Sequence, residues 1–357
     1  MNAVIAARTL TDGGQTALEI AGEIAEFLGE AQRSLDLALY HLELGPETAA
    51  VVGGAVRDAA ARGVAVRFVY NLEFENPIPV PPPPNTDDDL ILSLGVPSHS
   101  IAGIPDLMHH KFVVRDGSTV WTGSMNWTED SWTRQENVIV TVRSEELAYA
   151  FTLAFEQLWE HGDVSRSGRV EPRPVDVGDA LVRPWFTPKY GDDLSHRISK
   201  YLGRAKTRIR IASPVITAGP ILGTLAQLEG VDTAGIVDIT QTMEVLHQWE
   251  TNGVSAWKVP ILESILRRFP WSGKRSTPWT PETLHDFMHA KVVVADDVVF
   301  VGSFNLSRSG ESNAENVLEI HDAPLADKLA AYVDDVRARY PAVELGARPS
   351  VTDTGGV

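Results

Sequence analysis

The sequence predicts an α/β protein made of two similar halves of about 180 residues each. Three observations lead there. Helical and strand patterns alternate along the chain, one set of polar residues occurs twice in the same order, and 357 residues are enough for two units of ordinary domain size. Apolar residues form 43% of the chain, which is enough to build a buried core in each half.

The first half opens with a helix that its apolar spacing places at residues 16–33. A strand at 34–42, an alanine-rich helix at 47–62 and a second strand at 64–71 follow. Strands and helices that alternate with short joints are typical of a parallel sheet flanked by helices.

Residues 77–89, PIPVPPPPNTDDD, interrupt this pattern. Proline lacks the amide hydrogen that a helix or a central strand requires, so we expect an exposed loop of polyproline character that includes the acid triplet. A spacer is the simpler interpretation, and a ligand for a proline-recognition partner is the alternative.

A helix with one buried face is expected at 145–160, and a Pro-, Gly- and Arg-rich connector at 163–185. The chain therefore divides into an N-terminal half (1–162), the linker, a C-terminal half (186–345) and a disordered tail (346–357). The same order then returns, with a helix at 192–205, strands at 207–216 and 234–240, and a last helix at 324–340.

The internal repeat carries chemically reactive residues. MHHKFVVRDGSTVWTGSMNW starts at Met108, and MHAKVVVADDVVFVGSFNLS starts at Met288. With one single-residue gap, eight polar or glycine pairs stay in register: His109/His289, Lys111/Lys291, Asp116/Asp296, Gly123/Gly302, Ser124/Ser303, Asn126/Asn305, Glu136/Glu315 and Asn137/Asn316. A duplicated fold alone would preserve apolar periodicity rather than this set of side chains.

In an extended segment alternate residues share a face, so His109 and Lys111 point together and His110 points away. Two such pairs suit an anionic phosphorus centre, because cations and neutral donors compensate the charge on its oxygens without a metal. One imidazole can attack phosphorus while the other protonates the leaving oxygen. Glu136 and Glu315 can each hold a histidine in its working tautomer.

Both copies resemble the phospholipase D superfamily, whose signature is H-x-K-x4-D followed by G-S-x-N, and the first copy (109–126) resembles its bacterial nuclease-like branch. The second copy spans 289–305. The resemblance implies two α/β/α halves related by pseudo-twofold symmetry with one active site at their interface. It also implies a phosphodiesterase that forms a covalent phosphohistidine and uses neither a metal nor a cofactor.

The resemblance also implies a role for each motif residue. His109 would be the nucleophile and His289 the general acid, although the reverse assignment stays open. Four residues would bind the phosphoryl oxygens, supported by two serines: Lys111, Lys291, Asn126 and Asn305, with Ser124 and Ser303. Glu136 and Glu315 would orient the histidines. Four motif residues would be structural: Asp116, Asp296, Gly123 and Gly302.

A basic and aromatic segment precedes the second motif. Its members are Arg267, Arg268, Trp271, Lys274 and Arg275. Cations that follow a phosphate backbone and rings on which bases stack predict a nucleic-acid platform beside His289. The same mixture also fits a lipid headgroup interface, and a loop that caps the second half fits it equally.

The expected function is a nuclease that hydrolyses phosphodiester bonds. A phospholipase or phosphatidyltransferase, and an inactive nucleic-acid-binding module, are the alternatives. The net charge of −17 opposes a polyanionic substrate, but residues 1–180 hold 27 acidic against 12 basic side chains, so the second half is nearly neutral. The absence of cysteine excludes thiol chemistry and thiolate metal sites.

The sequence shows no secretory signal and no stretch that would span a membrane, so we expect a cytoplasmic protein without stable membrane insertion. Because both motifs lie in one chain, an oligomer is not required to complete the site.

Overall fold

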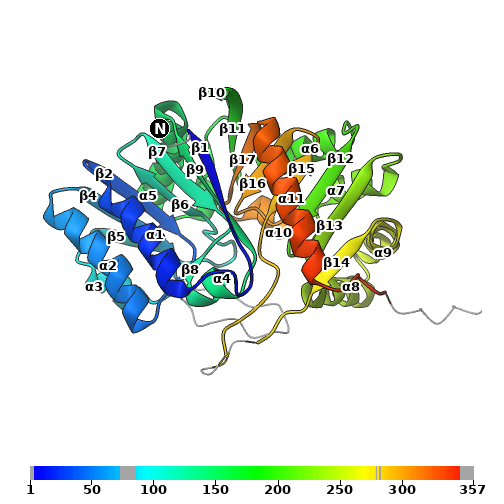
Figure 1. The fold of residues 1–357 in the computed structure, drawn as a ribbon, viewed down its shortest axis with the longest axis horizontal. Helices are drawn as coiled ribbons and strands as arrows, with labels where there is room; N and C mark the ends of the chain where they lie inside the picture. The colour runs from blue at the N-terminus through cyan, green and yellow to red at the C-terminus, as the bar shows by residue number, and fades with distance from the viewer. Residues whose placement is uncertain (1–3, 73–85, 279, 281–282, 346–357) are drawn as a thin grey trace, which may run out of the picture.

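The computed structural model of the chain describes residues 4–72, 86–278, 280 and 283–345. Two mixed sheets stand side by side (Figure 1). The first has the strand order β1 (Ile5–Leu10), β9 (Asn137–Arg143), β7 (Thr119–Gly123), β6 (Lys111–Arg115), β2 (Ser34–Leu39), β4 (Ala65–Asn71) and β5 (Ser98–Ile101). The second has the order β10 (Val175–Val177), β11 (Ala180–Phe186), β17 (Asn316–His321), β16 (Val298–Gly302), β15 (Val292–Ala295), β12 (Arg208–Ala212), β13 (Asp232–Asp238) and β14 (Trp271–Lys274).

The two sheets have the same topology. In each, three parallel strands (β2, β4 and β5; β12, β13 and β14) join an antiparallel group (β6, β7, β9 and β1; β15, β16, β17 and β11), and β10 adds one edge strand to the second sheet. A short pair, β3 (Leu42–Glu43) and β8 (Trp127–Thr128), lies beside the first sheet. The predicted architecture of two similar α/β halves is confirmed.

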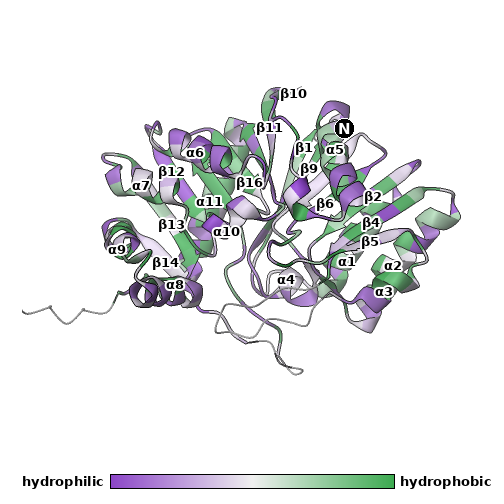
Figure 2. Ribbon diagram, turned by 180° about the vertical axis from the view of Figure 1, so that it is seen from behind, coloured by the Kyte–Doolittle hydropathy of each residue, from purple (hydrophilic) through white to green (hydrophobic). Residues whose placement is uncertain are grey.

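Helices flank both sheets. They are α1 (Ala17–Gly29), α2 (Pro46–Ala61), α3 (Asp88–Ser93), α4 (Glu129–Thr133) and α5 (Glu145–His161) in the first half, and α6 (Gly191–Leu202), α7 (Gly219–Gln227), α8 (Ile239–Asn252), α9 (Val259–Arg268), α10 (Arg308–Ser312) and α11 (Ala323–Arg339) in the second. Two 3₁₀ turns span Val164–Arg166 and Ala256–Lys258. Figure 2 shows apolar strands beside polar outer helices such as α8.

Local sequence explains the helix ends. Thr16 and Glu19 form a capping box at the start of α1, so two otherwise unpaired amide groups are satisfied. Ser144 caps the start of α5, and Gly162, with φ 61°, ends it in the left-handed conformation that glycine tolerates best.

One apolar core joins the halves. Phe151 and Phe155 on α5, Leu329 and Val333 on α11, and strand residues of both sheets belong to the same buried cluster. Phe151 meets Phe186 of the second half with ring centroids 5.0 Å apart. Because each sheet also keeps a separate outer core, the halves are two folded units that share a central apolar interface.

Two sequence expectations differ from the structure. The connector at 163–185 contains β10 and most of β11, and β11 pairs with β17 just as β1 pairs with β9. The prolines of this segment favoured a connector in the sequence analysis, although it forms two short strands. The acid triplet at 87–89 does enter a helix, because Asp87 caps α3 and the next two acids occupy its first turn, where negative charge is favourable. The proline run and the tail lie outside the described residues.

Candidate active site

Each motif places its histidine and lysine where the central antiparallel strand begins. In β6 the Nζ of Lys111 donates to the carbonyl of His109 (2.7 Å), and before β15 the Nζ of Lys291 donates to the carbonyl of His289 (2.5 Å). All four side chains are buried. The lysines are therefore held in the same way in both halves.

The halves meet through their motif segments. Met108 lies opposite Ala314 in one parallel bridge, and Met288 lies opposite Glu136 in another. Each bridge puts the histidine of one half against the Glu–Asn segment of the other. The two motifs are adjacent, because Lys291 acts electrostatically on His109 and Lys111 acts on His289. The histidines and lysines of the two copies are thus assembled in one site between the halves.

The two histidines face different groups. The Nδ1 of His109 lies 2.8 Å from both carboxylate oxygens of Glu315. The Nδ1 of His289 lies 3.0 Å from the amide oxygen of Asn137. An acceptor at Nδ1 fixes the proton there and leaves Nε2 for chemistry.

The expected contact between Glu136 and a histidine is wrong. Glu136 Oε2 accepts from Lys274 Nζ (2.9 Å), and Oε1 accepts from the Tyr340 hydroxyl. Lys274 is 2% exposed and also pairs with Asp286. Because a buried lysine needs a carboxylate partner, Glu136 serves a charge network between the halves.

Burial favours the uncharged forms in this site. It lowers the pKa of both motif histidines well below the usual range, aided by the nearby lysines. Burial lowers the pKa of Lys111 to about 7 and lowers that of Lys291 well below its usual value. Burial raises the pKa of Glu315 to about 8, against the pull of Lys111. An anionic ligand would therefore restore the charge on the lysines.

The Gly-Ser turns pack against the next strand. A Cβ on Gly123 would lie 2.0 Å from the Val138 carbonyl oxygen, and one on Gly302 would lie 2.1 Å from that of Asn316. The hydroxyl of Ser124 accepts from the Val138 amide, and that of Ser303 accepts from the Asn316 amide (3.0 Å each). Any side chain at Gly123 or Gly302 would clash with the next strand, so glycine is required at both positions. The hydrogen bond to each serine holds the turn against the strand that follows.

Asn126 and Asn305 lie two residues beyond these serines. Their buried amide oxygens have no hydrogen-bond partner among the described residues. A buried acceptor without a donor is costly, so each amide oxygen is available to a donor group of a ligand. Phosphoryl oxygens are acceptors and would require the Nδ2 side of these amides.

The motif aspartates lie at the far end of β6 and β15. Both adopt positive φ, 56° for Asp116 and 52° for Asp296. Asp116 accepts from the amides of residues 32–34, and Asp296 accepts from those of residues 206–208. They anchor the entry to β2 and β12 and do not touch the histidines.

The predicted substrate platform is not assembled. Arg268 donates to three carbonyls at the end of α7, and the Trp271 ring is buried with its Nε1 on the Ile265 carbonyl. Lys274 belongs to the charge network described above. Arg267 pairs with Glu263 at 4.0 Å, so of the five residues only Arg275 is exposed without a described partner.

Aromatic rings that the sequence did not single out pack on both histidines. Tyr40, at the end of β2, meets His109 with ring centroids 4.5 Å apart, and its ring lies 4.4 Å from Lys111 Nζ. Phe287 meets His289 at 4.8 Å. His110 points away, as expected, and is fully buried against Phe112. Tyr40 directly follows β2, and its place at the end of a buried strand was the sequence feature that could have pointed to it.

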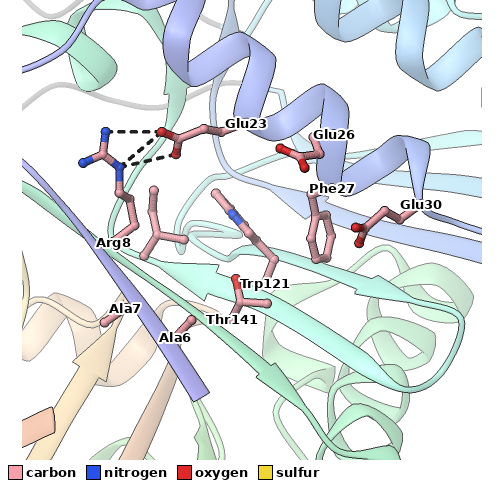
Figure 3. A pocket seen from close by; sticks show the side chains of 10 residues that line it. Ala6, Ala7, Arg8, Glu23, Glu26, Phe27, Glu30, Trp121 and Thr141 are labelled. Carbon is pink, nitrogen blue, oxygen red and sulfur yellow. Dashed lines mark hydrogen bonds and ion pairs between the residues drawn. The ribbon is translucent and has the colours of Figure 1, made fainter. Parts of the chain in front are cut away.

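A groove of about 260 Å³ lies elsewhere, between α1 and the first sheet (Figure 3). Glu23, Glu26 and Glu30 line it over Trp121, and Glu23 pairs with Arg8. The negative charge of these three glutamates would repel an anionic phosphodiester, so this groove is not a suitable substrate site. Within the described ranges no three His, Asp or Glu side chains converge as a metal site, and no helix is long and apolar enough to cross a bilayer.

Comparison with known proteins agrees with this geometry. The family model described as "Cardiolipin synthase, PLD-like domain" matches residues 24–159 and 198–337, which is most of both halves. Proteins named mitochondrial cardiolipin hydrolase are 33% identical over 143 residues in Xenopus tropicalis and 31% identical over 131 residues in Homo sapiens. These matches cover 37% and 36% of this chain and 58% and 47% of the relatives, so the chain spans about half the length of each.

Solved structures share the fold over nearly the whole chain. Phosphatidylserine synthase from Haemophilus influenzae Rd KW20 has a TM-score of 0.62 at 14% identity, covering 93% of this chain and 85% of its own. Polyphosphate kinase from Porphyromonas gingivalis has a TM-score of 0.57 at 12% identity, covering 92% and 46% respectively. With both halves matched by the family model and both motifs gathered at one interface, the chain belongs to the phospholipase D superfamily, within its cardiolipin synthase-like family.

Proposed function

We propose that this protein is a metal-independent phosphodiesterase that hydrolyses phospholipids through a phosphohistidine on His109. The observation that carries the proposal is the crossed site, in which His109 meets Glu315 of the other half while His289, Lys111 and Lys291 lie beside it. This set supplies a nucleophile, a proton carrier and two cations for the phosphoryl oxygens.

In the first step His289 carries protons on both ring nitrogens, because the negative charge of the bound phosphodiester offsets the burial that lowers its pKa in the free protein. The Nε2 lone pair of His109 attacks phosphorus, and the bond to the leaving oxygen breaks as that oxygen takes the proton from His289 Nε2. In the second step water attacks the phosphohistidine, His289 Nε2 takes a proton from that water, and the N–P bond breaks. The Nζ groups of the lysines and the Nδ2 groups of Asn126 and Asn305 donate to the phosphoryl oxygens throughout.

Phospholipid is favoured over nucleic acid for two reasons. The basic and aromatic segment was the reason to expect a nuclease. Three of its side chains make contacts within the protein instead of facing a substrate: Arg268, Trp271 and Lys274. The relatives with 33% and 31% identity are named cardiolipin hydrolases, and the matching family is described as cardiolipin synthase-like. We also propose that the protein is cytoplasmic and that one chain forms the complete active site without an oligomer.

The test is incubation with EDTA of four substrates: cardiolipin vesicles, phosphatidylcholine vesicles, a single-stranded DNA oligonucleotide and an RNA oligonucleotide. Release of phosphatidate or of a headgroup from vesicles is expected, without cleavage of either oligonucleotide. Oligonucleotide cleavage alone would establish the nuclease instead. Binding of an oligonucleotide without any turnover would indicate an inactive binding module, and activity that EDTA abolishes would contradict the metal-free mechanism.

A further inference from the structure

The two catalytic histidines differ in the group behind them, which is a carboxyl that can ionise in one case and an amide that cannot in the other. Glu315 stands behind His109, and Asn137 stands behind His289. Both partners are fully buried, so water does not equalise the two environments. In the sequence the two histidines and the two Glu–Asn pairs occupy equivalent positions of the repeat.

The difference arises from a shift of one residue where the halves cross. Each histidine follows the bridged methionine by one position, and its partner follows the other bridged residue by one position. Met108 is bridged to Ala314, so the next residue along is Glu315. Met288 is bridged to Glu136, so the next residue along is Asn137. A one-residue change of register therefore exchanges a carboxylate for an amide.

The contacts of Asn137 determine the proton position on His289. The Asn137 Nδ2 donates to the Ser131 carbonyl oxygen (2.9 Å), which can only accept. The amide oxygen must then face His289, and it also accepts from the Ser124 hydroxyl (2.7 Å). The His289 Nδ1 must therefore carry a proton, which leaves Nε2 for the substrate side.

The alignment of Met288 with Glu136 is stabilised by contacts to Asn137 and to Glu136. The Tyr332 hydroxyl of α11 donates to the carbonyl of Asn137 (3.3 Å) and to that of Leu10 (2.9 Å). Glu136 is held by Lys274. If Glu136 moved to His289, Lys274 would lose this buried carboxylate.

We propose that Asn137 is a positioning residue that holds His289 with a neutral acceptor, and that this neutrality reserves proton transfer for His289 and nucleophilic attack for His109. The inference rests on the proposed function and assigns the roles within it. In the attacking form the Nδ1 proton of His109 faces Glu315. As Nε2 bonds to phosphorus, positive charge grows on the ring and favours the ionised form of Glu315, which in turn stabilises that charge. A carboxylate behind His289 would instead stabilise its imidazolium, making it a weaker acid in the first step and a weaker base in the second.

The charged groups around His289 come from several elements. They are Lys291 on its own segment, Lys111 and His109 from the first half, His285 from the preceding loop, Asp238 at the end of β13, which accepts from the Met288 amide, and Glu136 opposite Met288. None of them is altered by a substitution at Asn137, so a shift in the titration of His289 would report the new charge.

The experiment replaces Asn137 by Asp and uses Asn316→Asp as the matched control. Asn316 is the repeat partner of Asn137, but its amide oxygen faces the non-catalytic His110 (3.1 Å). Each aspartate also loses the donations of the amide nitrogen, which go to the carbonyl and hydroxyl oxygens of Ser131 in one case and to the Thr122 hydroxyl in the other. The two variants thus place the same charge in equivalent positions at similar structural cost.

The kinetic readout is the pH profile of kcat with bis(p-nitrophenyl) phosphate, whose first leaving group needs no protonation. For Asn137→Asp the rising limb of the profile should move up by at least about one pH unit, and the phosphoenzyme trapped by alkaline quench should increase, because His289 stays protonated to higher pH. Asn137→Ala should lower kcat without that upward shift. Asn316→Asp should leave the limb in place.

A second readout needs no turnover. Histidine-selective NMR titration should show a raised pKa for His289 in Asn137→Asp and no such rise in Asn316→Asp. Unchanged titration and an unchanged limb in folded Asn137→Asp, or equal shifts in both variants, would overturn the inference. If the wild type neither turned over a diester nor formed a phosphoenzyme, the proposed function would fail, while the NMR comparison would still decide the role of Asn137. Should Asn137→Asp not fold, Glu315→Gln gives the reverse test, with slower phosphoenzyme formation and an unaltered His289 titration expected.

Discussion

The two halves agree in the parts that build each motif and differ where the halves touch. Asp116 and Asp296 share their left-handed conformation and their three backbone donors, and Gly123 and Gly302 approach the next strand equally closely. At the interface one histidine faces a carboxylate and the other faces an amide. In the proposed mechanism the repeated motif supplies the groups that bind the phosphoryl oxygens, whereas the interface distinguishes the two steps of the reaction.

The largest expected effect is the loss of either histidine. His109→Ala and His289→Ala should each lower turnover of the natural substrate by at least about 10³-fold, because a nucleophile or a proton carrier is removed. With bis(p-nitrophenyl) phosphate, His289→Ala should still form the phosphoenzyme and His109→Ala should not. His110→Ala is the control and should retain most turnover with a lower melting temperature. Equal phosphoenzyme levels in the two alanine variants would abolish the distinction between the halves.

The lysines should behave alike, since both donate to the carbonyl of their own histidine. Lys111→Met and Lys291→Met should each lower kcat by about 10²-fold to 10³-fold, the usual effect of removing one donor to a developing oxyanion. Because burial lowers the pKa of Lys111 to about 7, the free enzyme loses this cation as pH rises through 7. KM should therefore increase above pH 7 in the wild type, and initial-rate measurements across pH 6–9 would show it. An effect of only one lysine would mean that the phosphoryl group binds to one half alone.

The charge network of Lys274, Glu136 and Asp286 should stabilise the contact between Met288 and Glu136 but not the contact between Met108 and Ala314. Lys274→Met leaves Glu136 and Asp286 buried without their cation, and the expected loss is about 3–5 kcal/mol in the free energy of unfolding. Glu136→Gln should cost less, because Asp286 still neutralises Lys274. Denaturant unfolding measures both. A loss below about 1 kcal/mol for Lys274→Met would show that the network does not hold the register.

The smallest effect concerns the aspartate anchors. Asp296→Asn keeps a residue that tolerates positive φ but removes the charge, so a loss of about 1–3 kcal/mol is expected. Although burial opposes ionisation, hydrogen bonds from Thr207 and the neighbouring amides hold the pKa of Asp296 at about 2. Since the folded pKa lies below the unfolded value of about 3.9, this stability is present above pH 4 and is lost as pH falls towards 2. Asp116→Asn should behave similarly. Urea unfolding at pH 3 and pH 7 measures the difference between wild type and variant, which should be smaller at pH 3. A wild-type advantage that stays the same at pH 3 would contradict the role assigned to the charge.

The sequence predicted that the two histidine–lysine pairs meet in one site but not which residue faces each histidine across the interface. Alternation and spacing were enough to associate His109 with Lys111 and to expect carboxylates at the histidines. The exchange of Glu136 for Asn137 depends on a one-residue register between segments 152 positions apart, such as His289 and Asn137, which no local pattern encodes. Arg268, Trp271 and Lys274 were misinterpreted because residues that bind nucleic acid are the same residues that cap a helix, fill a core or neutralise a buried acid.

The most direct test of the unequal halves is to locate the covalent intermediate. Wild type and His289→Ala are mixed with bis(p-nitrophenyl) phosphate, quenched with alkali, digested and analysed by mass spectrometry. The account predicts an aryl phosphoryl group on the peptide that contains His109, more abundant in His289→Ala because the second step is blocked. Modification of His289 in the wild type would contradict it and reverse the roles of the two halves.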